Sequence, residues 1–428
     1  MPLQLFDTTL KLQGFEIDKA RAEFDVLDLG GIENRQQALV KYHFTNNHFY
    51  NSLVTDQSVS WEELPVLTKQ NLQQALHKRL SKGFTTKNIF KGKTSGSSGH
   101  PFTFGKDNYA HAMTWAAFHK AYSQHGIDLN TSLQARFYGI PLRGKARYVE
   151  LVKDFLSYRK RFPIFNMNEE VLQGFVQVFS KNDFEYINGY TSSIVLLAKY
   201  CQSKNIVLKS SCPTLKIGIV TSEMLFPDDR LLLEKWLGIP IFNEYGASEV
   251  GLIAMQNTHG DFEINQQNLY VEVVNEENRQ VADGEIGRIL VTDLYNKACP
   301  MIRYEIGDLG SLKTLDNGTR VLKDLQGRTS DVALLPSGKV VPGLTFYYVT
   351  KAIIKEDLDI LEFIVVQKQP AFFEIQYVSK SDMNAGIKKN IQKAMDDYLE
   401  PGLSLEFTKL EVLDRSKRGK LKQFMSEV

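Results

Sequence analysis

Cysteine and histidine are scarce in this chain, and neither is arranged as a metal or redox site requires. The three cysteines, Cys201, Cys212 and Cys299, are far apart, no CxxC pair is present, and none of the eight histidines lies in an HExxH motif. An odd number of scattered cysteines is typical of free thiols in a reducing compartment. We therefore expect no structural metal and a cytoplasmic location.

Long apolar runs and an excess of one charge are also missing. The apolar run 194–198 stops at Lys199, far short of the ~18 residues of a membrane span, and the first residues, MPLQLFDTTLKL, lack the form of a secretory signal. The chain has 51 Lys and Arg against 50 Asp and Glu, which gives no support for a nucleic-acid or polybasic membrane partner. What remains, 428 residues of which 43% are hydrophobic, is typical of a globular protein of two or three domains.

Helix-like and strand-like segments alternate in the middle of the chain and predict the fold class. The first 90 residues look mostly helical, for example 68–79, where leucines recur every four residues. Strands separated by helices need crossover connections, so we expect an α/β fold with mostly parallel sheets. The expected helices are 109–122 and 171–179, and the expected strands are 135–139, 217–221, 239–242, 269–274 and 287–292.

The last hundred residues form a pattern of their own. Helix-like segments at 346–354 and 381–399 are interleaved with strand-like segments at 362–367, 372–378 and 403–407. That length suffices for a small α+β domain. We expect a large domain over residues 1–329, with residues 1–90 as a helical leader packed on it, and a small domain over residues 330–428.

Glycines and hydroxyls are interleaved in KGKTSGSSGHP, residues 91–101. Glycines let backbone N–H groups turn inward, and hydroxyls and lysines add donors and positive charge, as a polyphosphate cradle requires. A flexible Gly/Ser linker is an equally good interpretation of this stretch alone. It is not a Walker loop, because Lys87 stands where the first glycine would be. The cradle would consist of Thr94, Ser95, Gly96, Ser97, Ser98 and Gly99.

A second stretch, FNEYGASEVG at 242–251, places an aromatic residue and a carboxylate, Glu249, after a strand-like segment. Such a pair suits a nucleotide base beside a Mg²⁺-held phosphate. The simpler alternative is a strand-to-helix turn in which Ser248 or Glu249 caps the helix. RYEIGD at 303–308, GRTSD at 327–331 and the basic tail at 415–422 are each ordinary turn or surface chemistry when taken singly.

Together and in this order, TSGSSGHP, EYGASE, RYEIGD, GRTSD and the terminal RGK resemble the motifs of the adenylate-forming (acyl-CoA synthetase) superfamily. The spacing and the short length are similar to its phenylacetate–CoA ligase-like branch, including relatives in capsule-polysaccharide biosynthesis. The resemblance covers residues 90 to 428. It implies a small C-terminal domain that swivels.

The resemblance implies a role for each matching residue. The Thr94–Gly99 stretch would hold the β,γ-phosphates, Glu249 would hold Mg²⁺, Asp308 with Arg328 would bind the ribose, and Lys420 would bridge the acid and the α-phosphate. The adenine would be framed by Thr221, Ser222, Glu223, Asn243, Glu244, Tyr245, Gly246 and Ala247, with Tyr245 stacked on it, and Ser248 would belong to the same cofactor site. The acid would lie in a pocket walled by Phe137, Tyr138, Asn188, Gly189 and Tyr190.

The implied activity is ATP- and Mg²⁺-dependent formation of an acyl-AMP from a small carboxylic acid, followed by transfer to a thiol such as coenzyme A. Transfer to a carrier protein or an amine, and a non-catalytic nucleotide-binding homologue, are the alternatives, and a homodimer is compatible with each. The sequence departs from many relatives in having no Cys after the EYG motif, so we expect no zinc. It also has Ser330 where the hinge residue is usually Asp or Lys.

Overall fold

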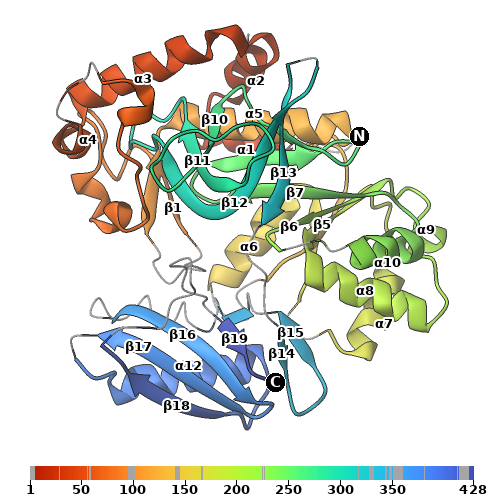
Figure 1. Ribbon diagram of the computed structural model, residues 1–428. Coiled ribbons are helices and arrows are strands. Elements are labelled where there is room, and N and C mark those ends of the chain that lie inside the picture. Colours follow the sequence, from red (N-terminus) through yellow and green to blue (C-terminus); the bar gives the residue numbers. More distant parts are fainter. Residues whose placement is uncertain are drawn as a thin grey trace.

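The computed structural model describes residues 5–27, 29–54, 56, 59–94, 102–139, 145–164, 167–223, 225, 227–316, 318–326, 332–342, 345–346, 349, 360–379, 381–411, 413 and 424–428. Over these residues it contains an eleven-stranded sheet flanked by helices and, toward the C-terminus, a separate four-stranded sheet (Figure 1). The expected α/β fold with a smaller C-terminal domain is therefore confirmed.

One half of the large sheet is parallel, as the alternation of helices and strands predicted. Its strands lie side by side in the order β4, β3, β5, β6 and β7. Helices connect them, because a parallel neighbour needs a crossover that returns the chain to the same end of the sheet. The strands are β3 (Gln134–Phe137), β4 (Arg159–Phe162), β5 (Tyr186–Tyr190), β6 (Ile217–Thr221) and β7 (Ile241–Ala247), and the helices between them are α6 (Lys145–Leu156), α7 (Glu169–Phe179), α8 (Thr191–Ser203), α9 (Leu208–Ser211) and α10 (Pro227–Leu237).

The other half is antiparallel, so the sheet as a whole is mixed rather than mostly parallel. Short turns join most of these strands, which makes antiparallel pairing the only arrangement they can reach. The strands continue from β7 in the order β8 (Gly251–Gln256), β9 (Phe262–Ile264), β13 (Arg320–Gln326), β12 (Tyr304–Thr314), β11 (Gly287–Asp293) and β10 (Leu269–Val274).

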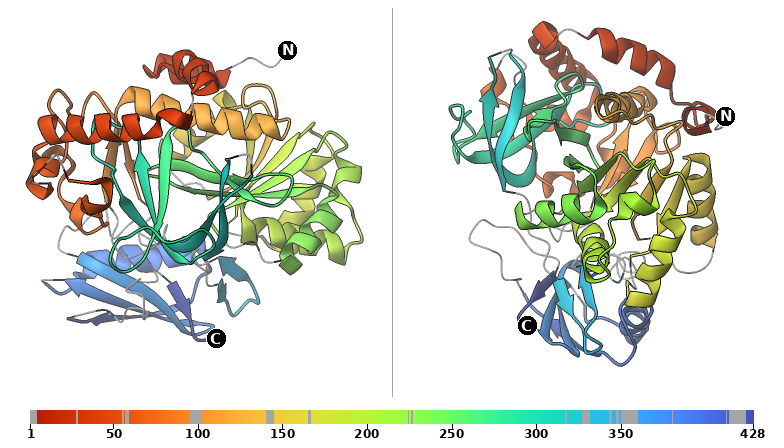
Figure 2. Two further views of the ribbon diagram at one scale, coloured as in Figure 1. Left: turned by 45° about the horizontal axis from the view of Figure 1, so that its top comes forward. Right: turned by 90° about the vertical axis from the view of Figure 1, so that its right-hand side faces the viewer.

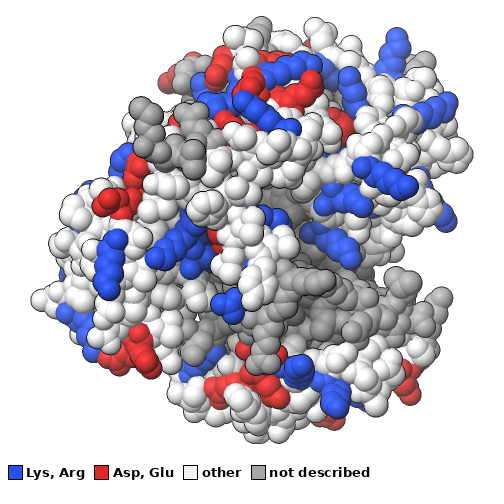
Figure 3. Space-filling model, turned by 180° about the vertical axis from the view of Figure 1, so that it is seen from behind, with Lys and Arg blue, Asp and Glu red and all other residues white. Residues whose placement is uncertain are grey.

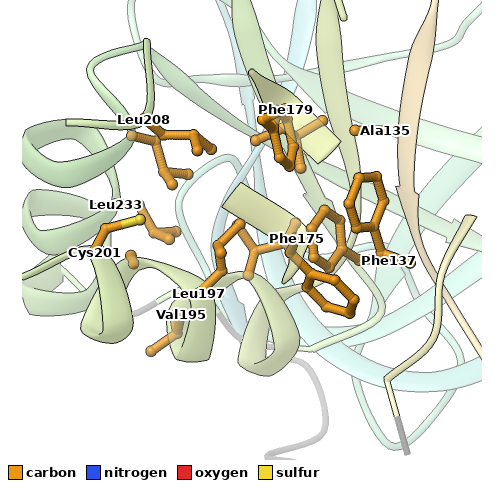
Figure 4. Packing of buried hydrophobic residues seen from close by; sticks show 14 of the residues in the cluster. Ala135, Phe137, Phe175, Phe179, Val195, Leu197, Cys201, Leu208 and Leu233 are labelled. Carbon is orange, nitrogen blue, oxygen red and sulfur yellow. The ribbon is translucent and has the colours of Figure 1, made fainter. Parts of the chain in front are cut away.

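Helices cover both faces of the parallel half. Helices α7 to α10 pack on one face, where Ala135 and Phe137 of β3 lie among buried side chains such as Phe175 and Phe179 of α7 (Figure 4). Helices α1 (Leu5–Leu12), α2 (Ile17–Val26) and α5 (Asn108–Gln124) pack on the opposite face. Because side chains alternate along a strand, Arg136 projects to the α5 face between two residues that face the core.

The N-terminal segment is helical only as far as residue 53. Helices α3 (Ile32–Asn46) and α4 (His48–Leu53) follow α1 and α2, but the helix expected over residues 68–79 is wrong: only 3₁₀ turns occur there, at Asn71–Gln73 and Leu76–Lys78. The Asn71 side chain accepts hydrogen bonds from the Thr68 N–H and hydroxyl. The backbone then becomes extended at Gln74 and Ala75, so the leucine spacing reflects burial of successive turns rather than one helix.

The C-terminal sheet has the order β18, β17, β16, β19, with helix α12 packed against it. It lies apart from the large sheet in each view (Figures 1 and 2). Residues 327–331 and most of the expected helix at 346–354 lie outside the described residues, so the boundary at 329/330 stays a prediction. The elements are β16 (Ile360–Gln369), β17 (Phe372–Ser379), α12 (Ala385–Tyr398), β18 (Ser404–Lys409) and β19 (Phe424–Ser426). Over the described residues, no helix combines the length and the apolar character that crossing a membrane requires.

Candidate functional site

The carboxyl ends of the parallel strands meet at one edge of the sheet. Phe137 at the end of β3 is level with Gly189, Tyr190 is level with Thr221, and Thr221 is level with Glu244. The sequence-predicted pocket and adenine segments are therefore brought together at this edge. In open α/β sheets, ligands bind in the crevice outside the carboxyl ends of the strands.

Two tyrosine–carboxylate hydrogen bonds join the motifs EYGASE and RYEIGD. The Tyr245 hydroxyl donates to Asp308 Oδ2 at 2.9 Å, and the Tyr304 hydroxyl donates to Glu249 Oε1 at 2.7 Å. Each motif thus supplies the tyrosine that holds the carboxylate of the other, across separations of 63 and 55 residues. Both carboxylates are buried, and a fixed, partly desolvated carboxylate is suited to a cation or to a pair of hydroxyls.

The base of the glycine-rich loop lies beside this pair. Strands β1 (Phe90–Lys93) and β2 (Thr103–Lys106) form an antiparallel hairpin. The Thr94 N–H donates to the Phe102 carbonyl, and the Phe102 N–H donates to the Thr94 hydroxyl, each at 3.0 Å. The Phe102 ring packs edge-on against Tyr304, with centroids 6.2 Å apart.

The two ends of the loop are hydrogen-bonded to each other. A flexible linker between two units would instead lead the chain away from its starting point, so this closure of the loop counts against the linker interpretation. The loop instead begins and ends next to the tyrosine that holds Glu249. Its remaining predicted residues, Ser95, Gly96, Ser97, Ser98 and Gly99, lie outside the described residues.

Residues 242–251 fold as a β-hairpin, not as the strand-to-helix turn considered above. Strand β7 continues to Ala247 and pairs antiparallel with β8, with Ala247 opposite Gly251. A Cβ on Gly246 would lie 2.7 Å from the Gly251 carbonyl oxygen, and Gly251 has a φ of +91°. Both glycines are therefore required for the tight turn, which leaves Ser248 exposed and buries Glu249.

Lys106 is a buried residue that sequence reasoning missed. Its ammonium group forms an ion pair with Asp293 at 3.0 Å and donates to the Thr114 hydroxyl at 2.9 Å and to the Val250 carbonyl at 3.0 Å. Burial raises the pKa of Asp293, against the opposing charge of Lys106. Lys106 thus ties the strand after the glycine-rich loop to the residue that follows Glu249. The available signal was a lysine at the end of the otherwise uncharged strand TFGK.

Glu244 does not face the predicted adenine site with its side chain. Its carboxylate accepts a hydrogen bond of 2.6 Å from the Tyr122 hydroxyl of α5 and one of 3.2 Å from the Thr221 hydroxyl. Burial raises the pKa of Glu244, and these hydrogen bonds oppose the shift. Because neighbouring residues of a strand face opposite sides, Tyr245 points the other way, toward Asp308. Glu244 therefore fixes β7 to α5 from beneath the site.

Of the other residues predicted for the adenine site, Ser222 and Glu223 directly follow β6, and Asn243 lies within β7. Ser222 is exposed and has a φ of +70°, a conformation that non-glycine residues seldom adopt. Glu223 is buried, and its carbonyl accepts from the Thr191 hydroxyl at 3.3 Å. The Asn243 N–H donates to the Gln256 side chain at 3.1 Å, so its backbone is held within the sheet.

The predicted acid pocket is only partly assembled. The rings of Tyr138 and Tyr190 meet with centroids 4.6 Å apart, and the buried Asn188 side chain lies 3.4 Å from both the Tyr122 hydroxyl and the Ile219 carbonyl. Phe137 is fully buried and stacked on Phe162. Its ring belongs to the core cluster (Figure 4), so we remove Phe137 from the pocket. Gly189 remains at the pocket edge, where a Cβ would lie 2.5 Å from Phe137.

The residues present fit a Mg²⁺ ion carried by a nucleotide. In such sites Mg²⁺ takes one or two carboxylates plus substrate phosphates, and Glu249 supplies one carboxylate beside the loop base. Among the described residues, no group of three or more His, Cys, Asp or Glu side chains is placed to hold a metal alone. Arg328 and Lys420 lie outside the described residues. The face opposite that of Figure 1 is hollowed, and basic side chains gather on its rim (Figure 3).

Comparison with known proteins gives three kinds of result. No family model matches the chain. Protein CapK of Staphylococcus aureus is 25% identical over 309 residues, which cover 68% of this chain and 64% of CapK. The phenylacetate–coenzyme A ligase of Escherichia coli (strain K12) is 31% identical over 144 residues, which cover 31% of this chain and 32% of that enzyme. The chain thus spans less than two thirds of the length of these curated relatives.

A solved structure has a similar fold. An open conformation of 2-hydroxyisobutyryl-CoA ligase, in complex with 2-HIB-AMP and CoA, aligns with a TM-score of 0.57 and 18% identity over 92% of this chain and 91% of that chain. At this identity the match speaks for the fold. In sequence the chain is similar to protein CapK and, over about a third of its length, to a phenylacetate–coenzyme A ligase, in line with the resemblance of its ordered motifs.

Proposed function

We propose that this protein activates a carboxylic acid with ATP, forming an acyl-AMP and releasing pyrophosphate, and then transfers the acyl group to a thiol such as coenzyme A. The observation that carries the proposal is the reciprocal pair Tyr245–Asp308 and Tyr304–Glu249. It brings a predicted ribose ligand and a predicted metal ligand to one edge of the sheet, next to the base of the glycine-rich loop.

The first step needs positioning and charge stabilisation rather than a covalent enzyme intermediate. A carboxylate oxygen of the acid attacks the α-phosphorus of ATP, and the bond to the pyrophosphate oxygen breaks. In this scheme Asp308 orients the ribose, Thr94 and the loop hydroxyls contact the phosphates, and Lys420 binds both the acid and the α-phosphate. Mg²⁺ held at Glu249 would offset the negative charge of the phosphates.

The second step exchanges one acyl acceptor for another. The sulfur of a thiolate attacks the acyl carbon, and AMP leaves with the electron pair of the broken bond. The solved neighbour that carries both 2-HIB-AMP and CoA supports a thiol as the acceptor here. Similarity to CapK keeps a second acceptor class, an amine or a carrier protein, in consideration.

The test is ATP–pyrophosphate exchange with a panel of aryl, fatty and hydroxy acids, followed by product analysis with coenzyme A or an amine. We expect exchange that depends on both the acid and Mg²⁺. Binding of ATP without exchange for any acid in the panel would instead identify a non-catalytic homologue. Exchange without thioester formation would reject coenzyme A as the acceptor and leave the first step standing.

A further inference from the structure

Three arginines lie on one face of the sheet where β3 pairs with β4. Arg136 of β3 is level with Arg161 of β4, and Arg159 precedes it on the same face. Arg159 and Arg161 are neutralised by α6: Arg159 contacts Asp154 at 2.6 Å, and Arg161 contacts Asp154 at 2.7 Å and Glu150 at 3.1 Å. Three guanidinium groups thus meet two carboxylates, both of which are already engaged.

Neither of these two carboxylates forms an ion pair with Arg136. Within the described ranges, no hydrogen bond or ion pair engages it, although its Nε is buried from solvent. Its guanidinium lies over the ring of Tyr138, 4.0 Å from the ring centroid. A buried donor without a partner costs free energy in the folded protein and calls for an explanation such as a bound ligand.

The charges around Arg136 make this position attractive to an anion. Burial and the nearby charge of Arg136 together lower the pKa of Arg159 to about 10, although Asp154 opposes the shift. The carboxylate on the far side is Glu244, whose hydrogen bonds go to Tyr122 and Thr221. The charge of Arg136 favours the ionised form of Glu244, but burial outweighs this effect and raises the pKa of that carboxylate, so Glu244 offsets the charge of Arg136 only in part.

Arg136 also adjoins residues of the predicted acid pocket. It is level with Asn188 of β5, it stacks on Tyr138, and Tyr138 contacts Tyr190. Between β3 and β7 are three strand spacings, or about 14 Å at ~4.8 Å each. A group bound by Arg136 is therefore distant from the site of attack near β7, at the far end of the acid.

We propose that Arg136 is a specificity residue and that the acid activated by this protein carries a second anionic group, a carboxylate or a phosphate ester, at the end remote from the reacting carboxylate. This inference rests on the proposed adenylation function and goes beyond it by naming the substrate class. A planar guanidinium presents paired donors that match either anion in a bidentate contact. The stacked Tyr138 ring holds the guanidinium in place before the substrate arrives.

The experiment uses matched pairs of acids in ATP–pyrophosphate exchange. Hexanoate is compared with hexanedioate, and phenylacetate with its 4-carboxy and 4-phosphonooxy derivatives. We expect the wild type to favour the dianionic member of a pair by about 10²-fold or more in kcat/KM, since a site built for a polar group rejects analogues that lack it. The carboxylate and phosphate arms tell the two anions apart.

Arg136→Met should abolish that preference, because it should lower kcat/KM only for the dianionic acids. Arg136→Lys should retain part of the preference through its charge alone. Lys160→Met is the matched control, because Lys160 is an exposed cation on β4 level with Ala135 and therefore faces away from Arg136. It should keep the wild-type preference. Thermal unfolding of each variant checks that the fold is intact.

Calorimetric titration with 4-carboxyphenylacetate alone gives a readout independent of adenylation. Binding that Arg136→Met loses, in a protein that shows no exchange with any acid, would reject the proposed function and keep the anion site. Two results would overturn the inference and keep the function. One is exchange that favours the acids without a second anionic group, and the other is an equal loss of exchange for both members of each pair in Arg136→Met. A raised KM for coenzyme A with unchanged acid preference would overturn it as well.

Discussion

Tyr245 and Tyr304 each hold a carboxylate that belongs to the other motif. The role of each hydrogen bond can therefore be tested separately from the role of the carboxylate that accepts it. Replacing a tyrosine by phenylalanine removes only the hydroxyl and leaves the carboxylate in place. Replacing the carboxylate removes the group that would bind the ligand. Paired variants of this kind distinguish a ligand contact from a structural one.

Glu249→Gln should weaken the dependence of adenylation on Mg²⁺ while leaving the fold intact. The amide has nearly the same shape and still accepts the 2.7 Å hydrogen bond from Tyr304, but it lacks the charge that a hard cation needs. The measurement is the Mg²⁺ concentration for half-maximal ATP–pyrophosphate exchange, which should rise at least about tenfold. In Tyr304→Phe, which keeps the carboxylate, that concentration should change much less. Unchanged Mg²⁺ dependence in Glu249→Gln would remove this residue from the metal site.

Asp308→Ala should raise the KM for ATP by roughly 5- to 150-fold, the equivalent of about 1–3 kcal/mol for hydrogen-bonding groups left without partners. The same variant should make little difference with 2′,3′-dideoxy-ATP, because that analogue has no hydroxyls to lose. Tyr245→Phe, which removes the 2.9 Å contact to Asp308 and keeps the carboxylate, should have a smaller effect. Equal use of ATP and the dideoxy analogue by the wild type would show that Asp308 does not bind the ribose.

Buried polar contacts fasten the helical leader to the loop after β11 and to helix α5. His43 of α3 donates from Nε2 to the Asn296 carbonyl at 2.8 Å, and its Nδ1 lies 3.3 Å from the Ser81 hydroxyl. At the other end of the leader, Asp7 of α1 contacts His119 of α5 at 2.8 Å. These contacts make the attachment of the leader sensitive to pH.

Stability should therefore fall as the pH drops from about 6.5 toward 4. Burial lowers the pKa of His43 to about 4, against the opposing hydrogen bond to Asn296, while an unfolded histidine titrates near 6.5. The folded state thus binds fewer protons than the unfolded state in this window, and the contribution of neutral His43 is fully present above it. The loss by pH 4 is on the order of 3 kcal/mol. Chemical denaturation of wild type and His43→Asn at pH 7, 5.5 and 4.5 measures it.

His43→Asn should lower stability at pH 7 and flatten the pH dependence. The matched control is His48→Asn, because the His48 side chain is exposed on α4. A slope between pH 6.5 and 4.5 that is identical in wild type and His43→Asn would contradict the assignment.

Motif order and strand alternation could be read from the sequence because they are local or sequential properties. These properties were enough to predict the parallel half of the sheet and the segments that lie along its carboxyl edge. The direction of individual side chains could not be read in this way. Phe137 and Glu244 lie in the right strands but face the core and α5, respectively, because one residue of strand register decides the face.

Tertiary contacts account for the other differences. Leucines at 72 and 76 have helical spacing, yet the buried Arg79 donates to the Gln74 carbonyl and holds the chain in short turns. The partners of Lys106 lie as far away as Val250 and Asp293. No local pattern can show that a lysine will find a buried carboxylate almost two hundred positions along the chain.

The two sheets of the molecule bear on how the first step of the reaction can be organised. The reciprocal tyrosine pairs belong to the large sheet. The predicted lysine is near the C-terminus, four residues before β19, which pairs in parallel with β16 in the small sheet. Under the proposed function, Lys420 would act on ATP bound at the large sheet. The swivel expected from the resemblance stays a prediction.

Lys420→Ala should cut acyl-AMP formation by about 10²–10³-fold, the size expected for losing one donor to charge that develops in the transition state. Because that charge appears only as the bond forms, the affinity for ATP should change little and the loss should fall on kcat. Lys417→Ala and Lys422→Ala are matched controls in the same basic segment and should stay near wild type. Once supplied with synthetic acyl-AMP, the Lys420 variant should still transfer the acyl group to the thiol, since that step no longer needs the contact. Quenched-flow measurement of each half-reaction separates the two. Equal rates of acyl-AMP formation in all three variants would show that the tail is a solvated terminus and that adenylation proceeds without Lys420.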